Sequence, residues 1–333
     1  MALISTRKVL EHLQQTYHQS PALTSLAILG GFTAFTSLLD ITSFVYLHFL
    51  RTSSLRSYLD PKKPSWALVT GASDGIGRGF AEELLSQGFD VILHGRNPSK
   101  LERVKAELLP QWPNRQVEIL ILDAMLDCED NGKMENAMRK VQGLNLKILV
   151  NNVAGELQPL FQSHALRSAA DNRKLMNGNF IFATEMTRLL LPRLTANKPS
   201  LILNIGSGSA RLPCPYIAIA AASKAFLESF SRALAAEMVA EGHSDVAVMY
   251  NLVGMCSTGS EPRPVTFLVP SSRQFARSSL NLVGSGRRTV WGYWPHALQF
   301  ETIFKLPHSI IEWVCIDLVR KLRAQDESWR GRK

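Results

Sequence analysis

The sequence predicts an α/β fold with a doubly wound parallel sheet behind an N-terminal transmembrane helix. Short apolar runs alternate with helical patterns over residues 65–300, which is typical of a parallel sheet covered by helices. A glycine-rich turn at residues 70–77 joins the first apolar run to a helical pattern. Ahead of both, residues 22–50 contain one charged side chain and exceed the roughly 20 residues that a helix needs to cross a bilayer.

The composition narrows the classes of protein to which this chain can belong. A chain of 333 residues with 46% hydrophobic residues can bury a sizeable core. The net charge is +9, but no basic patch is interleaved with aromatic residues, so nucleic acid is not an expected partner. The cysteines are scattered without a C-x-x-C pair, which argues against a disulfide framework and a metal site and fits a reducing compartment. They are Cys128, Cys214, Cys256 and Cys315.

The N-terminal part divides into a polar stretch at residues 1–21, an anchor at 22–50 and a basic linker at 51–64. The anchor starts too late and runs too long for a cleaved signal peptide. The alternative is a helix packed on the domain or on a partner. Its one charge, Asp40, is costly in lipid, so it lies near an end, faces a partner or divides the stretch into a re-entrant pair.

Four basic residues follow the anchor and predict its orientation. By the positive-inside tendency, they place the domain that follows in the cytosol. They are Arg51, Arg56, Lys62 and Lys63.

The glycine-rich turn carries the clearest chemistry. Trp66 to Val69 is expected to form a buried strand, and T-G-A-S-D-G-I-G follows at residues 70–77. Gly71 permits a sharp turn, while Gly75 and Gly77 let the backbone approach a pyrophosphate at a helix N-terminus. The alternative is an ordinary turn, but the flanking strand and helix favour a dinucleotide site.

The spacing T-G-x-x-x-G-I-G resembles that of the Rossmann-type short-chain dehydrogenase/reductase family, over roughly residues 64–300. The run W-A-L-V-T-G-A-S-D-G-I-G is most similar to membrane-bound very-long-chain 3-ketoacyl-CoA reductases and 17β-hydroxysteroid dehydrogenases. The resemblance implies cofactor contacts along the turn. These residues are Gly71, Ser73, Gly75, Ile76 and Gly77.

Two strand ends are expected to hold the adenosine part of the cofactor. Arg96 follows a predicted strand at Asp90–His94, and in the family a basic residue there accommodates a 2′-phosphate. NADPH is therefore expected over NADH. Asp123 follows a third strand at Val117–Leu122, and the resemblance implies a hydrogen bond to the adenine amino group. The alternatives are a solvated arginine and a helix-capping aspartate.

Further motifs match the family's catalytic side. A fourth strand at Lys147–Val150 leads into N-N-V-A-G, similar to the family's N-N-A-G, where Asn151 supports the sheet and borders the cofactor. A long helical pattern at 171–194 contains Asn179, which corresponds to the asparagine that anchors a proton-relay water. Ser207, after a fifth strand at 201–205, corresponds to the serine that binds the substrate carbonyl.

The catalytic tyrosine of the family is missing. Lys224 corresponds to the lysine that binds the nicotinamide ribose, and the tyrosine position four residues earlier is Ala220. The nearest phenol, Tyr216, lies one helical turn upstream if the helix extends that far. A positioned acid contributes about 10²–10⁴-fold to such a reduction. The proton would then come from Tyr216, water or the substrate.

The C-terminal third is expected to shape the substrate side. After a sixth strand at 246–252, residues 253–258 match the family's P-G-x-x-x-T with Val253 in place of proline, which predicts a less rigid loop. Thr258 keeps the nicotinamide-side role. Residues 259–272 are expected to form part of a substrate loop.

An aromatic group and a C-terminal helix complete the chain. Trp291, Tyr293 and Trp294 line an apolar pocket or pack in the core. Residues 301–333 are read as an amphipathic helix with a basic tail, packed on its own domain or forming a homodimer interface.

These motifs predict an NADPH-dependent oxidoreductase acting on a lipophilic ketone or alcohol: a fatty acyl thioester, a steroid-like compound, or a polyketide or terpenoid intermediate. The resemblance implies the endoplasmic reticulum membrane with a cytosolic catalytic domain. The alternative is a cofactor-binding pseudoenzyme that scaffolds a membrane-bound partner. Intact Asn179, Ser207 and Lys224 favour the enzyme, whereas Ala220 and Val253 favour the pseudoenzyme.

Overall fold

A computed structural model describes residues 11, 14–15 and 20–330, and the chain divides into two units, Met1–Thr52 and Ser53–Lys333. Most of the predicted polar stretch at 1–21 and the last three residues of the basic tail lie outside the described residues.

The described part of the first unit is dominated by one apolar helix. Helix α2 (Pro21–Val45) continues directly into a π-helical turn, η1 (Tyr46–Leu50). The most apolar 18-residue stretch of these 30 residues has a mean hydropathy of 1.7, and 6% of that stretch is buried. At 1.5 Å per residue the helix is about 45 Å long, enough to cross a bilayer with its headgroups. The helix is unbroken at Asp40, so it forms one candidate span and not a re-entrant pair.

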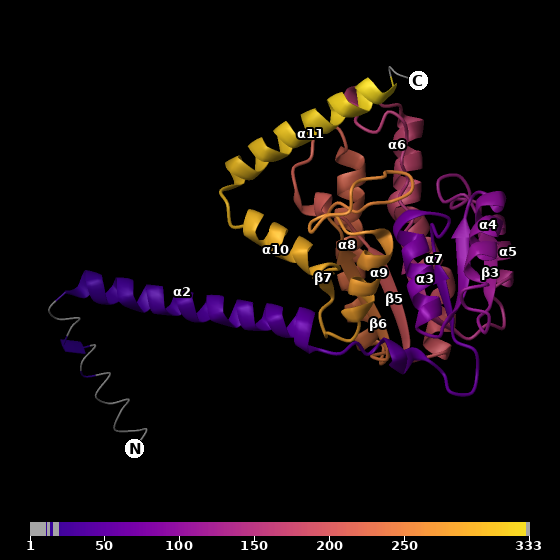
Figure 1. Ribbon diagram of the computed structural model, residues 1–333, viewed down its shortest axis with the longest axis horizontal. Coiled ribbons are helices and arrows are strands. Elements are labelled where there is room, and N and C mark those ends of the chain that lie inside the picture. Colours follow the sequence, from indigo (N-terminus) through magenta and orange to yellow (C-terminus); the bar gives the residue numbers. More distant parts are fainter. Residues whose placement is uncertain (1–10, 12–13, 16–19, 331–333) are drawn as a thin grey trace. The chain divides into compact units, whose positions relative to one another are not determined.

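A seven-stranded parallel sheet forms the centre of the second unit, in the order β3-β2-β1-β4-β5-β6-β7 (Figure 1). The strands are β1 (Trp66–Val69), β2 (Asp90–Gly95), β3 (Val117–Ile121), β4 (Leu146–Asn151), β5 (Ser200–Ile205), β6 (Val246–Leu252) and β7 (Thr289–Trp291). The predicted doubly wound α/β fold is confirmed. The strand order reverses between β1 and β4, and ligands of such sheets bind at the carboxyl ends of the strands beside this reversal.

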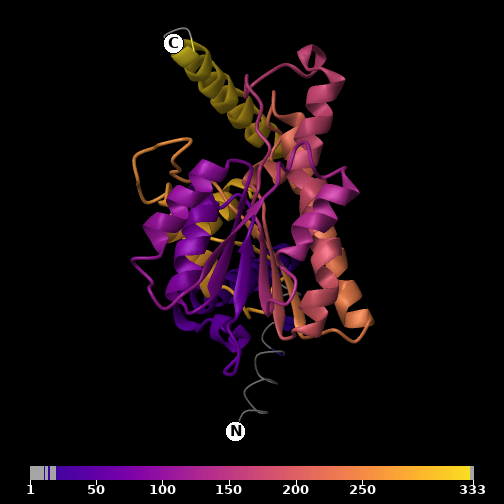
Figure 2. The same cartoon turned by 90° about the vertical axis from the view of Figure 1, so that its right-hand side faces the viewer.

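Helices cover both faces of the sheet (Figure 2). On one face lie α3 (Gly75–Ser86), α4 (Pro98–Leu108) and α9 (Ser272–Asn281). On the other lie α5 (Asn131–Arg139), α7 (Phe182–Ala196) and α8 (Ala218–Ala240). The remaining helical elements are η2 (Leu55–Tyr58), η3 (His164–Leu166), α6 (Ala169–Met176), η4 (Asn177–Ile181), η5 (Gly208–Arg211), α10 (Trp294–Ile303) and α11 (His308–Arg330).

The C-terminal helix α11 packs against its own domain. Ile311, Cys315 and Val319 recur at helical spacing and are 4–7% exposed. The Cys315 thiol contacts the Cys214 thiol in the loop ahead of α8. The opposite side of α11 includes Trp313, which is 69% exposed.

Helices α3 and α9 pack closely because Gly79 has no side chain. A Cβ at Gly79 would lie 2.5 Å from the Ser272 carbonyl oxygen, at the start of α9. Next to this contact, the rings of Phe80 and Phe275 meet edge to face with centroids 6.3 Å apart. Both rings are fully buried, so this pair of helices forms one side of the core.

We expect Gly79→Ala to destabilise the protein, because the added methyl group would push α9 away from α3. The cost should be about 1–3 kcal/mol, as for other overpacked sites. Thermal unfolding in detergent measures it. Gly132→Ala is the matched control, since the nearest neighbour of its added Cβ is 3.4 Å away. Gly132 lies within a helix, so alanine there should be neutral or stabilising by up to about 1 kcal/mol. Equal melting temperatures for the two variants would contradict the packing argument.

Candidate active site

The glycine-rich turn brings the start of α3 against the ends of β1 and β4. Gly71 and Gly75 have φ angles of +68° and +57°, in the left-handed region that favours glycine. A Cβ at Gly77 would lie 2.3 Å from the Gly71 carbonyl oxygen. Asp74 caps α3, since its carboxylate accepts from the Gly75 N–H at 2.6 Å. The turn therefore brings a helix N-terminus without side chains at Gly75 and Gly77 to the strand reversal, where a phosphate can approach the backbone.

Asn152, which the sequence analysis did not select, clamps this turn. Its side-chain amide donates to the Thr70 carbonyl at 3.0 Å, and its backbone N–H donates to the Thr70 hydroxyl at 2.8 Å. The neighbouring Asn151 is 3% exposed and donates to Thr187 and Asn204, at 3.1 and 2.8 Å. Asn151 thus joins β4 to β5 and α7 inside the core, in keeping with its predicted support of the sheet.

His94 is a second residue that the sequence analysis missed. It lies in β2, is 1% exposed and stacks on Phe182 with ring centroids 4.8 Å apart. Its Nδ1 accepts from the Gly71 N–H at 3.3 Å, so the ring supports the sharp turn. Burial lowers the pKa of His94 from 6.5 to about 4, which keeps the imidazole neutral near pH 7.

The predicted adenosine side comes together at the ends of β2 and β3. The Ser73 hydroxyl oxygen lies 3.6 Å from the Cβ position of Gly95, and Arg96 follows directly. The Arg96 side chain is 68% exposed, and its Nη1 is 3.9 Å from an Asp123 carboxylate oxygen. The other Asp123 oxygen accepts from the Met125 N–H at 2.9 Å. Arg96 is therefore held at the surface with terminal nitrogens open to a ligand.

Asn179 lies in the π-helical segment η4, which interrupts the long helix predicted over 171–194. Its side-chain amide donates to the Gly155 and Leu175 carbonyls, both at 2.8 Å. Asn179 is 2% exposed. Such π-helical segments often occur at functional sites, and this one directs Asn179 toward the loop that follows β4.

Lys224 is buried in α8 and its ammonium group donates to the Ile205 carbonyl at 3.2 Å, directly before the Ser207 loop. Burial lowers the pKa of Lys224 to about 8, and the charge of Glu156 opposes this effect. Burial and repulsion from Glu261 raise the pKa of Glu156. Glu156 is exposed whereas Lys224 is buried, so solvent screens the Glu156 carboxylate more strongly. Glu156 is thus a further ionisable group beside Lys224.

Ser207 caps the short helix η5 and accepts two hydrogen bonds from Ser209. They come from the backbone N–H at 3.2 Å and the hydroxyl at 2.9 Å. An ion pair between Arg211 and Glu228, with Arg211 Nε 3.2 Å from the carboxylate, ties η5 to α8. The Ser207 hydroxyl hydrogen remains available for a substrate carbonyl.

The structure corrects the expectation for Tyr216. Helix α8 begins at Ala218, and Tyr216 lies in the turn before it with a φ angle of +65°. Tyr216 is therefore not one helical turn upstream of Ala220. The guanidinium carbon of Arg323, on α11, lies 4.6 Å from the centre of the Tyr216 ring. The phenol is packed against the C-terminal helix, while Ala220 lies in the first turn of α8, one turn before Lys224.

A different phenol, Tyr250, lies behind the site in β6. It is fully buried, and its hydroxyl donates to the Lys224 carbonyl at 2.7 Å. A Cβ at Gly206 would lie 2.0 Å from its ring, so the ring fills the space that this glycine leaves. Burial raises the pKa of Tyr250. Tyr250 therefore supports the backbone around Lys224, and its proton is held by a carbonyl.

The loop after β6, which the sequence analysis expected to be less rigid because of Val253, is tied down by hydrogen bonds. The Gly254 N–H donates to Nδ1 of His296 at 3.1 Å, and Nε2 of His296 is 3.1 Å from the carbonyl oxygens of Met255 and Leu268. His296 is fully buried. The expected loss of rigidity is thus offset by a side chain that the sequence analysis did not select.

Thr258 reaches the glycine-rich turn from this loop. Its Cβ lies 3.2 Å from the Cβ position of Gly75. The structure therefore brings Thr258 beside the start of α3, where the sequence analysis expected a cofactor contact.

The three C-terminal aromatic residues divide between core and loop. Trp291 stacks on Phe300 with ring centroids 4.3 Å apart and is 5% exposed, so it is a core residue. Tyr293 meets the His296 ring edge to face at 5.1 Å. Trp294 meets Phe267, in the expected substrate loop, at the same centroid distance.

A family model described as short chain dehydrogenase matches residues 65–263. The chain belongs to this family. The very-long-chain 3-oxoacyl-CoA reductase of Podospora anserina is 34% identical to it over 273 residues, 82% of this chain and 76% of the relative. The human inactive hydroxysteroid dehydrogenase-like protein 1 is 32% identical over 309 residues, 91% of this chain and 92% of the relative.

Solved structures support the fold of this short-chain dehydrogenase. A 7β-hydroxysteroid dehydrogenase superposes with a TM-score of 0.67 at 17% identity, over 76% of this chain and 97% of the other. A short-chain dehydrogenase from Sphingobium yanoikuyae, solved in complex with NADPH, has a TM-score of 0.59 at 24% identity, over 73% and 92% of the two chains. The family predicted from the glycine turn is confirmed.

We expect the stability of this short-chain dehydrogenase to fall in mild acid because of His94. In the unfolded chain His94 binds a proton below about pH 6.5, whereas in the folded chain it binds a proton only below about pH 4. The free energy of unfolding should therefore drop over that window, by up to about 3 kcal/mol.

Thermal unfolding from pH 7 to 4.5 compares His94→Gln with the unmodified protein. The variant should not show the loss of stability that protonation of His94 causes. His308→Gln, at the exposed start of α11, is the control and should not alter the profile. A His94→Gln profile parallel to that of the unmodified protein would contradict the assignment.

Proposed function

We propose that the protein is a membrane-anchored, NADPH-dependent reductase of lipophilic ketones, with 3-oxoacyl thioesters as the first substrate class to test. The observation that carries this proposal is the buried Lys224 ammonium at the carboxyl end of β5, beside Ser207 and with the glycine turn intact. The Podospora relative is named for the same chemistry. Its reverse reaction, oxidation of the alcohol, uses the same groups.

The residues present fit a dinucleotide phosphate. The first turn of α3 has no side chain at Gly75 or Gly77, so its backbone beyond the N–H that Asp74 caps can lie close to a phosphate. Arg96 supplies an exposed guanidinium for the 2′-phosphate, and Asp123 lies beside it for the adenine. Lys224 would hold the nicotinamide ribose. Two family structures, from Sphingobium yanoikuyae and Thermococcus sibiricus, contain NADPH and a modified NADP. A bound nicotinamide would supply the hydride.

The residues around Ser207 and Lys224 would orient the ketone and compensate its developing charge. The Ser207 hydroxyl can donate to the carbonyl oxygen, since its lone pairs already accept from Ser209. The Lys224 ammonium adds positive charge nearby. Position 220 is an alanine, so the proton would come from water or from a group other than a tyrosine at this position.

A lipophilic substrate agrees with the loop around the site. Val265 and Phe267 are 55% and 56% exposed, and Phe267 contacts Trp294. We propose that this loop covers the acyl chain. The candidate span would hold the domain on a membrane, and the endoplasmic reticulum remains the expected membrane.

The second candidate function is a cofactor-binding pseudoenzyme that scaffolds a membrane-bound partner. Two observations favour it: Ala220 has no ionisable group, and Tyr216 is packed under Arg323. The human relative that is named inactive matches this chain over 92% of its length. Both candidates bind NADPH, so turnover and not binding separates them.

We expect Ala220→Tyr to create or raise NADPH-dependent reduction of 3-oxoacyl thioesters. A tyrosine there would stand one helical turn from Lys224, whose charge lowers a phenol pKa. The gain could approach about 10²–10⁴-fold, the contribution of a positioned acid. NADPH oxidation by detergent-purified protein, against a panel of lipophilic ketones, measures it. Ala220→Phe is the matched control, because it adds the ring without the hydroxyl and should give no gain.

Turnover by the unmodified protein would support the reductase, and Tyr216→Phe should leave that turnover unchanged because Tyr216 lies outside α8. Loss of activity in Tyr216→Phe would show that this phenol is the donor after all. No turnover before or after Ala220→Tyr, together with intact NADPH binding, would favour the scaffold.

We expect NADPH to bind more tightly than NADH, and Arg96→Ala to remove that difference. An arginine–phosphate contact is a strong, charge-assisted hydrogen bond, so its loss should weaken NADPH binding roughly 10- to 100-fold and leave NADH unchanged. Isothermal titration with each cofactor measures this. Arg103→Ala, an equally exposed arginine on α4, is the control and should alter neither affinity. Equal affinities in the unmodified protein would refute the assignment.

A further inference from the structure

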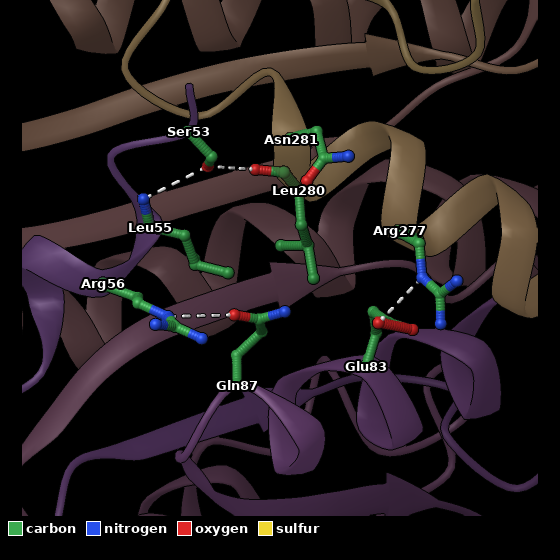
Figure 3. Close-up of a pocket in the computed structure, with 8 residues that line it drawn as sticks. All are labelled: Ser53, Leu55, Arg56, Glu83, Gln87, Arg277, Leu280 and Asn281. Atoms are coloured by element: carbon green, nitrogen blue, oxygen red, sulfur yellow. Dashed lines mark hydrogen bonds and ion pairs between the residues drawn. The ribbon is translucent and has the colours of Figure 1, made fainter. Parts of the chain in front are cut away.

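A small polar pocket lies at the far end of α3 from the glycine turn (Figure 3). Its volume is about 210 Å³, enough for a phosphate group with several water molecules. Its lining residues come from η2 and the segment before it, from α3 and the residue that follows it, and from α9. They are Ser53, Leu55, Arg56, Glu83, Gln87, Arg277, Leu280 and Asn281. Glu83 is eight residues, or about 12 Å of helix, beyond Gly75, so the pocket is separate from the cofactor turn.

The pocket carries an excess of positive charge. Glu83 is 4% exposed and its two oxygens accept from Arg277 and Arg273, at 3.1 and 3.2 Å. Burial opposes the ionisation of Glu83, but these hydrogen bonds outweigh it and lower its pKa. Among the described residues, Arg56 has no carboxylate partner, and its Nε donates a long bond of 3.4 Å to Gln87. The lining therefore holds two guanidinium groups and one carboxylate, and that carboxylate is also paired with Arg273 outside the pocket.

Both pocket arginines have donors left for a ligand. Arg56 and Arg277 use only Nε in the hydrogen bonds of the described chain, so their terminal nitrogens are not engaged there. Figure 3 shows the two guanidinium groups at opposite sides of the pocket, with Gln87 and Glu83 between them. Two arginine forks around one cavity match the geometry of a phosphate.

The pocket begins where the chain leaves the candidate membrane span. Ser53 is three residues after Leu50, the last residue of the span, and three extended residues reach at most about 11 Å. The headgroup layer of one leaflet is about 5–8 Å thick. If the span crosses a bilayer, as the proposed function requires, the lining residue Ser53 lies within reach of lipid phosphates.

From Ser53 onward the chain is fixed to the domain around the pocket. The Ser53 hydroxyl donates to the Leu280 carbonyl at 2.7 Å, and the Ser54 N–H donates to the Val283 carbonyl at 3.1 Å. Leu55 is 4% exposed, in the core. A Cβ at Gly284 would lie 1.9 Å from the Ser54 hydroxyl oxygen, so the chain segments are in direct contact.

We propose that this pocket binds the phosphate headgroup of an anionic membrane lipid and thereby fixes the catalytic domain at the bilayer surface. The excess of guanidinium groups selects lipids with net negative charge over zwitterionic ones. The binding energy would orient the domain as well as hold it near the surface, since the pocket is built from three segments of the fold. This inference rests on the membrane anchoring in the proposed function.

The test uses the full chain reconstituted with equal parts phosphatidylcholine and phosphatidic acid, then extracted in mild detergent. Mass spectrometry of the retained lipid measures the preference for phosphatidic acid. Arg56→Gln combined with Arg277→Gln should lower that preference roughly 10- to 100-fold. Arg56→Gln alone leaves the Glu83 pairs intact and should retain the fold, with about a tenfold loss.

Lys62→Ala combined with Lys63→Ala is the matched control, because it removes two charges from the same exposed linker outside the pocket. It should keep the preference for phosphatidic acid. An equal loss in this control would overturn the pocket and leave a general attraction of the basic linker. Folding of each variant is checked by its melting temperature.

Two further outcomes separate the pocket from its alternatives. Hydrogen exchange at residues 53–56 and 277–283 should slow with phosphatidic acid but not with inorganic phosphate in phosphatidylcholine discs. Equal protection by inorganic phosphate would mean that the pocket takes a soluble anion, which overturns the lipid assignment. Release of the protein by a carbonate wash would instead refute the anchor, independently of any loss seen in the arginine variants.

Discussion

The close approach of α3 to the ends of β1 and β4 is the constraint on which the rest of the site depends. It requires a bare backbone at Gly77, because any side chain would meet the Gly71 carbonyl. The Asn152 amide and the Thr70 hydroxyl close the gap between the two strands, and His94 supports the turn from β2. These hydrogen bonds join the turn to β2 and β4, so the helix N-terminus is fixed before any ligand arrives.

The framework around Lys224 is built from backbone contacts that do not involve Ala220. Its ammonium group is held by a carbonyl of β5, and its own carbonyl is held by Tyr250 of β6. Asn179 is held by Gly155 and Leu175. Holding a buried ammonium costs free energy, as its lowered pKa shows. The fold thus holds Lys224 in the geometry of a cofactor site although this costs free energy. For this reason both proposals, the reductase and the scaffold, predict NADPH binding.

The segment that begins the second unit is tied to the body of the domain. Ser53 and Ser54 are hydrogen-bonded to the carbonyls of Leu280 and Val283 at the end of α9, and α9 in turn packs on α3 through Gly79. The helix that starts at the cofactor turn thus ends at the pocket that Ser53 lines. A ligand at the pocket would bear on the same helix as the cofactor.

The sequence by itself determined the long apolar helix near the N-terminus, six of the seven strands, the glycine turn and the family, because apolar runs and glycine spacing are local patterns. It could not determine which side chains meet across the fold. Asn152 rather than Asn151 clamps the turn, and His296 replaces the rigidity of a proline, through contacts between residues about 40 to 80 positions apart. Strand β7 has three residues, too few for a pattern. Only the tertiary structure placed Tyr216 outside α8, since a positive φ angle and the contact with Arg323 depend on how α11 packs.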